Sequence, residues 1–166
     1  MVLAREEAER FGVLARPALA PLHRLARALC ADRARADDLV QETFVRALRY
    51  FGGYQGGDIR AWLAAIMRNL HRGGFTAGPA TVDLAAVEEP AAPGRDPEQA
   101  AIRAEEDARL RRHLAALPEP LAEALRLREF AGLSYAEIAQ AQGVPVGTVM
   151  SRIARARARL RESLSA

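Results

Sequence analysis

The sequence predicts an all-α protein built from two small helical domains joined by a flexible linker. Half of the residues are hydrophobic, many of them alanine, while only 5% are aromatic, a composition that favours helices over strands. Apolar residues recur with helical spacing in residues 8–72 and again in residues 99–164. Residues 73–98 between them are rich in Gly, Pro and Ala without a sustained period, which is typical of a linker.

Charge is divided along the same lines. The chain of 166 residues carries a net charge of +3, and all 24 of its basic residues are arginine. Residues 73–107 hold eight acidic and two basic residues, a net charge of −6, whereas residues 144–166 hold five arginines and one glutamate, a net charge of +4. An acidic connector therefore precedes a basic terminus, and basic segments of this kind favour nucleic-acid partners.

Composition and spacing also argue against several classes of function. The single cysteine, Cys30, allows no internal disulfide, and the three histidines lack the spacing of metal ligands. The sequence contains no phosphate-binding glycine loop, no Ser/His/Asp constellation, no signal peptide and no apolar run long enough to span a membrane. We therefore expect a cytoplasmic protein with no catalytic residues, no metal, no cofactor and no membrane insertion.

The segment ADDLVQETFVRALRYF predicts an amphipathic helix that begins at Asp37 and Asp38. Its apolar stripe is formed by Val40, Phe44, Ala47 and Leu48. A second face carries Asp38, Gln41, Glu42 and Val45. This face is either ordinary solvated surface or a docking surface for a basic partner.

Glycines at positions 52, 53, 56 and 57 predict a loop that contains Phe51 and Tyr54. A helix over residues 58–71 follows, with Trp62, Ile66 and Leu70 on one apolar face and with Trp62 expected in the core. Arg68, Asn69 and Arg72 gather at its end. Polar side chains beside an aromatic loop could hold single-stranded DNA, which is bound by stacking and by contacts to base edges, although composition alone does not require it.

The segment from Leu133 to Leu160 predicts a helix-turn-helix. Ser134 and Glu137 have the spacing of a capping box, and Leu133 and Ile138 have that of a hydrophobic staple. Gly143 suits the left-handed end of the first helix, and Pro145 suits the first turn of the second. Two helices joined by such a tight turn are typical of a DNA-binding unit.

The second helix has two stripes. Val149, Ile153, Ala156 and Leu160 are expected to face the core, as are the upstream leucines Leu114, Leu117, Leu121, Leu125 and Leu127. Thr148, Arg152, Arg155 and Arg159 form a polar, cationic stripe with Ser151 beside it. A recognition helix presents its N-terminal half to base edges in the major groove, while Arg157, Arg159 and Arg161 are expected to meet phosphates or solvent. The alternative is a surface helix whose arginines serve solubility.

Taken together, ADDLVQETFVRAL, IRAWLAAIMRNL and LPEPLAEALRLREFAGLSYAEIAQAQGVPVGTVMSRIARARARL resemble the extracytoplasmic-function (ECF) sigma factors of the bacterial sigma-70 family. The resemblance covers nearly the whole chain. It implies a sigma region 2 bundle at residues 8–72, a linker at 73–98 and a sigma region 4 helix-turn-helix at 99–164. It also implies a promoter-specificity subunit of RNA polymerase that is not an enzyme.

The resemblance assigns roles to individual positions. Asp38, Gln41 and Glu42 would dock on the clamp helices of the polymerase β′ subunit, and region 4 would meet the β flap. The upstream promoter element would be read as duplex DNA by Thr148, Met150, Ser151, Arg152 and Arg155. The downstream element would be captured as a melted single strand by Phe51, Tyr54, Arg68, Asn69 and Arg72. An anti-sigma factor is a further partner that the resemblance implies.

The sequence departs from the family pattern at two places. Met150 stands where many relatives have a basic residue, and only Arg72 follows Asn69 where relatives usually continue with several basic residues. A stand-alone helix-turn-helix regulator that never engages polymerase is kept as the alternative. A sigma-like decoy for an anti-sigma factor is less well supported, since the chain carries no receiver domain.

Overall fold

A computed structural model describes residues 5–74 and 96–166, and within these two segments all regular structure is helical. The predicted all-α class is therefore confirmed. The elements are α1 (Arg5–Ala15), the 3₁₀ turn η1 (Arg16–Ala18), α2 (Leu19–Leu29), α3 (Arg33–Tyr50), the 3₁₀ turn η2 (Phe51–Gly53), α4 (Ile59–Arg72), α5 (Pro97–Ala115), α6 (Glu119–Glu129), α7 (Tyr135–Gln142) and α8 (Val146–Ser165).

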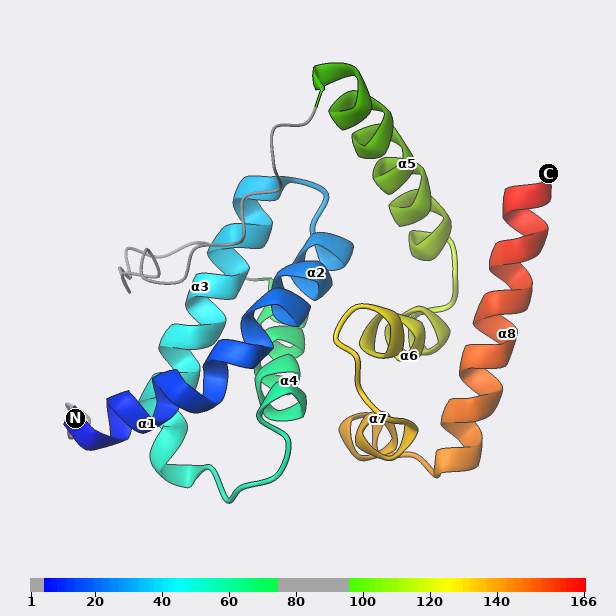
Figure 1. Ribbon diagram of the computed structural model, residues 1–166. Coiled ribbons are helices and arrows are strands. Elements are labelled where there is room, and N and C mark those ends of the chain that lie inside the picture. Colours follow the sequence, from blue (N-terminus) through cyan, green and yellow to red (C-terminus); the bar gives the residue numbers. More distant parts are fainter. Residues whose placement is uncertain (1–4, 75–95) are drawn as a thin grey trace.

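Helices α1 to α4 form the N-terminal half, in which α2, α3 and α4 pack against one another (Figure 1). Leu22 of α2, Leu39 of α3 and Leu63 of α4 are fully buried between them. Each of these helices is amphipathic, and burial of its apolar stripe is what stabilises so short a helix. The bundle fixes the positions of the α3 surface and of the end of α4.

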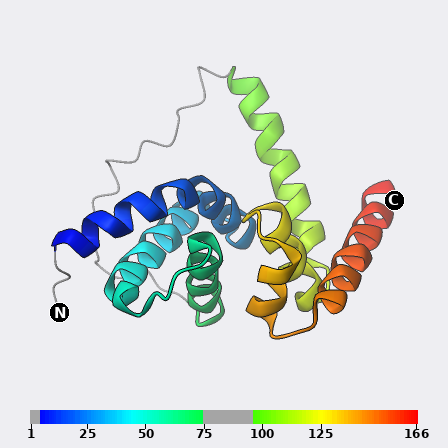
Figure 2. The same ribbon diagram turned by 60° about the horizontal axis from the view of Figure 1, so that its bottom comes forward.

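Helices α6, α7 and α8 form the core of the C-terminal half, with α8 packed across both of the others (Figure 1). Leu133, Ile138 and Ile153 are buried where they meet. Helix α5 joins this half only near its end, where Leu114 is its one buried side chain. Residues 97–107 of α5 are exposed, and this part of the helix extends away from the other helices in both views (Figures 1 and 2).

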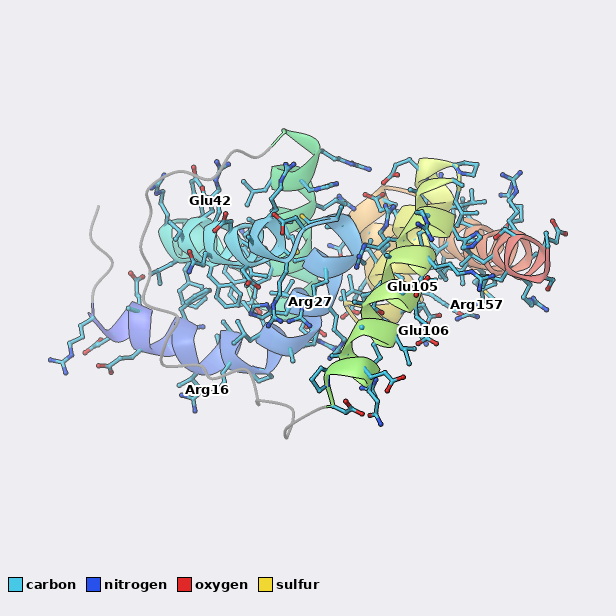
Figure 3. The ribbon with its side chains drawn as sticks, turned by 90° about the horizontal axis from the view of Figure 1, so that it is seen from above. Arg16, Arg27, Glu42, Glu105, Glu106 and Arg157 are labelled. Atoms are coloured by element: carbon cyan, nitrogen blue, oxygen red, sulfur yellow. The ribbon has the colours of Figure 1, made fainter. Side chains whose placement is uncertain are left out.

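The acidic connector is partly helical. Asp96 caps α5 by accepting a hydrogen bond from the backbone N–H of Glu98. Glu105 and Glu106 lie within α5 itself (Figure 3). Helix α5 thus begins two residues before the predicted boundary at residue 99, and most of the predicted linker, residues 75–95, lies outside the described part of the chain.

Helix α3 begins earlier than the sequence pattern suggested. Its N-cap is Asp32, whose carboxylate accepts a hydrogen bond from the backbone N–H of Ala34 at 3.1 Å. Asp37 and Asp38 are therefore inside the helix and not at its start, which corrects the prediction. The reason is that Asp32 is extended and satisfies a free amide of the first turn, as an N-cap does.

The predicted apolar stripes are largely the buried ones. Leu114, Leu121, Leu125, Leu127, Val149, Ile153 and Ala156 are buried as expected. Leu48, Leu117 and Leu160 are only partly buried and pack at the edge of the core. Trp62 and Ile66 likewise flank the buried face of α4, which is centred on Leu63, Met67 and Leu70.

The two halves touch. Helix α4 contacts α7, and α2 contacts α6, so the end of α4 lies against the C-terminal half (Figure 2). This contact contains ion pairs and a hydrogen bond made by Arg68 and Arg72, two of the predicted site residues.

Candidate nucleic-acid interface

The helix-turn-helix is built as the sequence predicted. The Ser134 hydroxyl accepts a hydrogen bond from the backbone N–H of Glu137 at 3.2 Å, and the Glu137 carboxylate accepts one from the backbone N–H of Ser134 at 2.7 Å. Gly143 ends α7 in the left-handed region, at φ 65°. Pro145 is the N-cap of α8 and so stands one residue before the first turn that was predicted for it.

The outer face of α8 presents the residues predicted to read duplex DNA. Met150, Ser151 and Arg155 are exposed, and Thr148 and Arg152 are partly buried. The Arg152 guanidinium donates a hydrogen bond to Gln142 Oε1 of α7 at 2.9 Å. The outer face of α8 is thus a mixed polar and apolar surface in which Arg152 is held by α7 and Arg155 is exposed.

Arg157 does not belong to this surface. Its guanidinium is paired with Glu129 of α6 at 2.5 Å, and the pairing raises the pKa of Arg157 (Figure 3). The Arg157 side chain is still 47% exposed in this pair, so the expectation that it meets phosphate or solvent stays a prediction. Arg159 and Arg161 are exposed and keep that expectation as a prediction.

Phe51 lies inside an aromatic cluster of the N-terminal half. It is 5% exposed and contacts Phe11 edge-on at 5.3 Å, Tyr54 in a stacked arrangement at 5.6 Å and Trp62 edge-on at 6.4 Å between ring centroids. A ring enclosed in this way has no free face on which a base could stack. The structure therefore corrects the assignment of Phe51 to strand binding and gives it a packing role.

Tyr54 is partly exposed at the edge of the same cluster. Its hydroxyl donates a hydrogen bond to the carbonyl of Gly57 at 2.6 Å. Gly56 and Gly57 both have positive φ, 89° and 94°, so the loop conformation depends on glycine. Tyr54 thus lies at the surface of a shaped loop, where its contact with a base stays a prediction.

Asp58 fixes the start of α4. Its carboxylate accepts a hydrogen bond from the backbone N–H of Arg60 at 2.8 Å and pairs with the Arg60 guanidinium at 2.7 Å. The Arg60 hydrogen bonds lower the pKa of Asp58. Arg60 is therefore engaged by its own helix cap.

The end of α4 carries the three polar residues predicted to bind a single strand, and they differ in exposure. Asn69 is exposed. Arg68 reaches α6 and α7, with its Nε 3.4 Å from Glu123 Oε1 and one guanidinium N–H donating to the carbonyl of Ala141 at 2.7 Å. Arg72 pairs with the same Glu123 oxygen at 2.7 Å. Two of the three residues thus contact the other half of the protein.

The predicted docking face of α3 is partly exposed. Asp38, Gln41 and Glu42 share it, and Glu42 lies on the side of α3 that faces away from α1 (Figure 3). Glu42 is paired with Arg46 one turn later at 2.8 Å. Exposed pairs of this kind contribute little to stability, about 0.3–0.5 kcal/mol, so the carboxylate remains available to another cation.

Sequence reasoning missed Glu123 and Gln142. Glu123 is buried in α6, although it is a charged residue. The Gln142 amide donates a hydrogen bond to Glu123 Oε2 at 2.9 Å and accepts one from Arg152. No local signal marks either residue, because their partners are distant in the sequence.

The described residues hold no group of histidine, cysteine, aspartate and glutamate side chains that could bind a metal ion. None of the helices in residues 5–74 and 96–166 is both long and apolar enough to cross a bilayer.

Comparison with known proteins agrees with this architecture. Residues 14–72 match the family model for sigma-70 region 2, and residues 107–160 match that for sigma-70 region 4. The RNA polymerase sigma-H factor of Pseudomonas aeruginosa is 37% identical over 144 residues, which cover 80% of this chain and 75% of that protein. The ECF RNA polymerase sigma factor EcfG of Rhodopseudomonas palustris is 38% identical, covering 86% and 78%.

A solved structure shares the fold over most of its length. The sigma factor RpoE from Bartonella quintana, crystallised in complex with the anti-sigma factor NepR, superposes with a TM-score of 0.65 at 27% identity, covering 96% of this chain and 98% of that one. Both halves, their order and the helix-turn-helix at the C-terminal end are those of such proteins. The chain belongs to the sigma-70 family and is an RNA polymerase sigma factor of the ECF type.

Proposed function

We propose that this sigma factor binds core RNA polymerase and reads a promoter at two places. Residues 8–72 act as region 2, which docks on polymerase and holds the melted downstream element. Residues 99–164 act as region 4, which meets the β flap and reads the upstream element as duplex, and residues 73–98 connect them. The observation that carries the proposal is the outer face of α8, the second helix of a helix-turn-helix whose first helix, α7, begins with a capping box and ends at the left-handed Gly143.

Duplex reading is assigned to Thr148, Met150, Ser151, Arg152 and Arg155. The guanidinium groups of this set can bind guanine in the major groove, where one well-placed pair discriminates between bases by about 1–3 kcal/mol. Met150, which is 53% exposed, supplies an apolar contact suited to a thymine methyl group. Its place among the polar residues gives this protein a different upstream contact from relatives with a basic residue there.

Strand capture is assigned to Tyr54, Arg68, Asn69 and Arg72. Phe51 stacks on the Tyr54 ring and holds it in place. Exposing bases costs a few kcal/mol each, and the energy comes from binding the exposed strand. Because both halves are fixed on one polymerase, the second DNA contact is effectively intramolecular, so two weak contacts become one specific complex.

Docking on the β′ clamp helices is assigned to Asp38, Gln41 and Glu42. An anti-sigma factor is a further proposed partner, supported by the relative from Bartonella quintana that was crystallised with one.

The docking role has a direct test with a matched control. Glu42→Arg reverses the charge of the proposed contact, whereas Glu9→Arg makes the same change in a second pair spaced by one turn, Arg5–Glu9 of α1. We expect Glu42→Arg to weaken binding to core polymerase at least tenfold, since like charges across an interface cost several kcal/mol, and Glu9→Arg to leave it unchanged. Equal polymerase affinity for both variants would reject the docking role.

A further inference from the structure

Two large apolar side chains are exposed in the first two turns of α8. Val146, the first residue of the helix, is 42% exposed, and Met150 is 53% exposed. Residues four positions apart lie on the same face of a helix, so the two side chains form one apolar patch, which we call the Val146–Met150 patch. From α8 the core takes Val149, Ile153 and Ala156, so packing does not account for the exposed part of the patch.

The patch borders the face of α8 that the proposed function gives to duplex DNA. Successive residues are turned by about 100° around a helix axis, so Ser151 lies between the patch on one side and Arg152 on the other. One turn earlier, Gly147 takes the middle position and Thr148 the side of Arg152. A side chain added at Gly147 would meet no atom within 4 Å. The first two turns of α8 thus present an apolar flank and a polar flank on either side of an open middle line.

The position of the patch limits what it can contact. Exposed apolar side chains are common on protein surfaces and by themselves indicate no partner. A recognition helix, however, presents its N-terminal residues to base edges in the major groove. The apolar group that unmodified base pairs present there is the C5-methyl group of thymine. Neither valine nor methionine has a side-chain donor that could hold a phosphate, so this methyl group is the partner that fits the patch.

The two side chains suit this contact in different ways. Val146 is branched at Cβ and has one strongly preferred rotamer in a helix, so it offers a fixed surface. Met150 is unbranched and carries a polarisable sulfur atom, so it can adapt to the position of the methyl group. The two residues are about 6 Å apart along the helix axis, and successive base pairs are about 3.4 Å apart. The patch therefore covers one or two neighbouring base pairs.

We propose that the Val146–Met150 patch reads the C5-methyl group of a pyrimidine in the upstream promoter element. This inference rests on the proposed function, in which α8 reads that element as duplex; it adds Val146 to the reading residues and names the chemical group that is recognised. Thymine is preferred at this position to uracil and to unmodified cytosine, which both lack the methyl group. Methylation of cytosine at C5 supplies the same group, so methylation at this position strengthens promoter binding.

The test removes one methyl group at a time from the DNA. Holoenzyme made from core RNA polymerase and the full chain is bound to a duplex promoter mapped for this protein. Each thymine of the upstream element, on either strand, is replaced singly by deoxyuridine, which lacks the methyl group and keeps every hydrogen-bonding group. We expect binding to weaken by about threefold to fourfold at one position or two neighbouring ones, as for exposing one buried methyl-sized group, and to stay unchanged elsewhere.

Variants of the patch assign this effect to its side chains. Met150→Ala and Val146→Ala remove the proposed partners of the methyl group and keep a residue that favours helices. The preference for thymine over uracil should be lost in Met150→Ala and reduced in Val146→Ala. Leu164→Ala is the matched control, because Leu164 is 43% exposed on the same helix but lies in its last turn. This control should keep the full preference.

A second arm restores the methyl group in a different base. The sensitive T·A pair is replaced by a C·G pair, with cytosine or with 5-methylcytosine in the strand that carried thymine. We expect the wild-type holoenzyme to bind the 5-methylcytosine promoter about threefold to fourfold more tightly than the cytosine promoter. Met150→Ala should bind the two promoters equally.

The outcomes distinguish the methyl contact from the function on which it rests. If the protein directed no initiation, the proposed function would fail, and the inference with it. Mapped promoters whose upstream elements tolerate uracil at every thymine would overturn the methyl contact alone. A uracil effect of equal size in the wild type and Met150→Ala would assign it to DNA shape and would also overturn the contact. Loss of the preference in the patch variants, with Leu164→Ala unchanged, would support it.

Discussion

The outer face of α8 and the end of α4 both carry arginines proposed to bind DNA, but they differ in availability. On α8, Ser151 and Arg155 are exposed. At the end of α4, Arg68 is enclosed by α6 and α7 and both arginines are paired with Glu123. The residues proposed to read duplex DNA are therefore largely accessible, whereas Arg68, one of those proposed to bind the single strand, is covered and its neighbour Arg72 is half exposed.

This difference fits the order in which the two elements become accessible. Duplex DNA is present before initiation, while a single strand exists only after melting. In this conformation Arg68 is occupied by Glu123 and by the Ala141 carbonyl, so its guanidinium is not available to a single strand. The aromatic loop around Tyr54 and the turn at Gly143 position the two sets of residues. Each can be altered by a substitution that leaves the other in place.

The largest effect is expected at the support of the strand-binding loop. Phe51→Ala should lower the free energy of unfolding by about 3–5 kcal/mol, because it removes a buried ring from the aromatic cluster. Thermal and urea denaturation measure it. Tyr54→Phe, which removes only the hydrogen bond to Gly57, should cost about 1 kcal/mol. A loss below about 1 kcal/mol for Phe51→Ala would contradict the packing role.

The next effect concerns base reading on α8. Arg152→Ala should weaken promoter binding by about 1–3 kcal/mol on promoters that carry the base that Arg152 prefers, and transcription from them should fall accordingly. The loss should be smaller on other promoters. Arg161 is an exposed arginine near the end of the same helix. Arg161→Ala should weaken binding to all promoters slightly and to a similar extent. Equal losses on every promoter for Arg152→Ala would contradict base reading.

The turn that positions α8 depends on one glycine. Gly143→Ala should lower stability by about 1–2 kcal/mol, since it forces a side chain into the left-handed region, while the added methyl group meets no atom within 4 Å. Gly147→Ala, which is equally open but lies in α8 at negative φ, should raise stability by roughly 0.5–1 kcal/mol. If both substitutions changed the free energy of unfolding in the same direction, the role given to Gly143 in the turn would be contradicted.

The smallest effect is a pH dependence of the closed state. Burial and the neighbouring Arg126 lower the pKa of His71, against a weaker opposite effect of Glu119 and a further lowering by Arg35. Arg68, Arg72 and Glu123 are the other charged groups around it. Opening therefore takes up a proton, so the closed state is stable above the ordinary histidine pKa of about 6.5 and weakens as the pH falls below it.

Small-angle X-ray scattering at about pH 7.5 and about pH 6 measures this opening. The two values lie on either side of the ordinary histidine pKa of about 6.5, below which opening is expected to begin. The radius of gyration should rise slightly at the lower pH. His71→Gln, which cannot take up the proton, should show no such rise. An identical response in the variant would assign the change to other groups.

What the sequence predicted well is local. The capping box of Ser134 and Glu137 and the turn at Gly143 involve residues a few positions apart, so their signals lie in short stretches. The burial of Phe51 was missed because a loop of glycines gave no hint that Phe11, forty positions earlier, would cover it. The contact between the two halves was missed for the same reason, since Arg68 and Ala141 are 73 positions apart. The roles of individual DNA- and polymerase-binding residues stay predictions.

The most direct test of the central claim is run-off transcription with core RNA polymerase on genomic DNA fragments, with and without this protein, followed by mapping of the start sites. The account predicts new, reproducible starts that share two spaced sequence elements, with Arg152→Ala affecting use of the upstream one. DNA binding that persists without polymerase, together with no added initiation, would contradict the account and favour a stand-alone helix-turn-helix regulator.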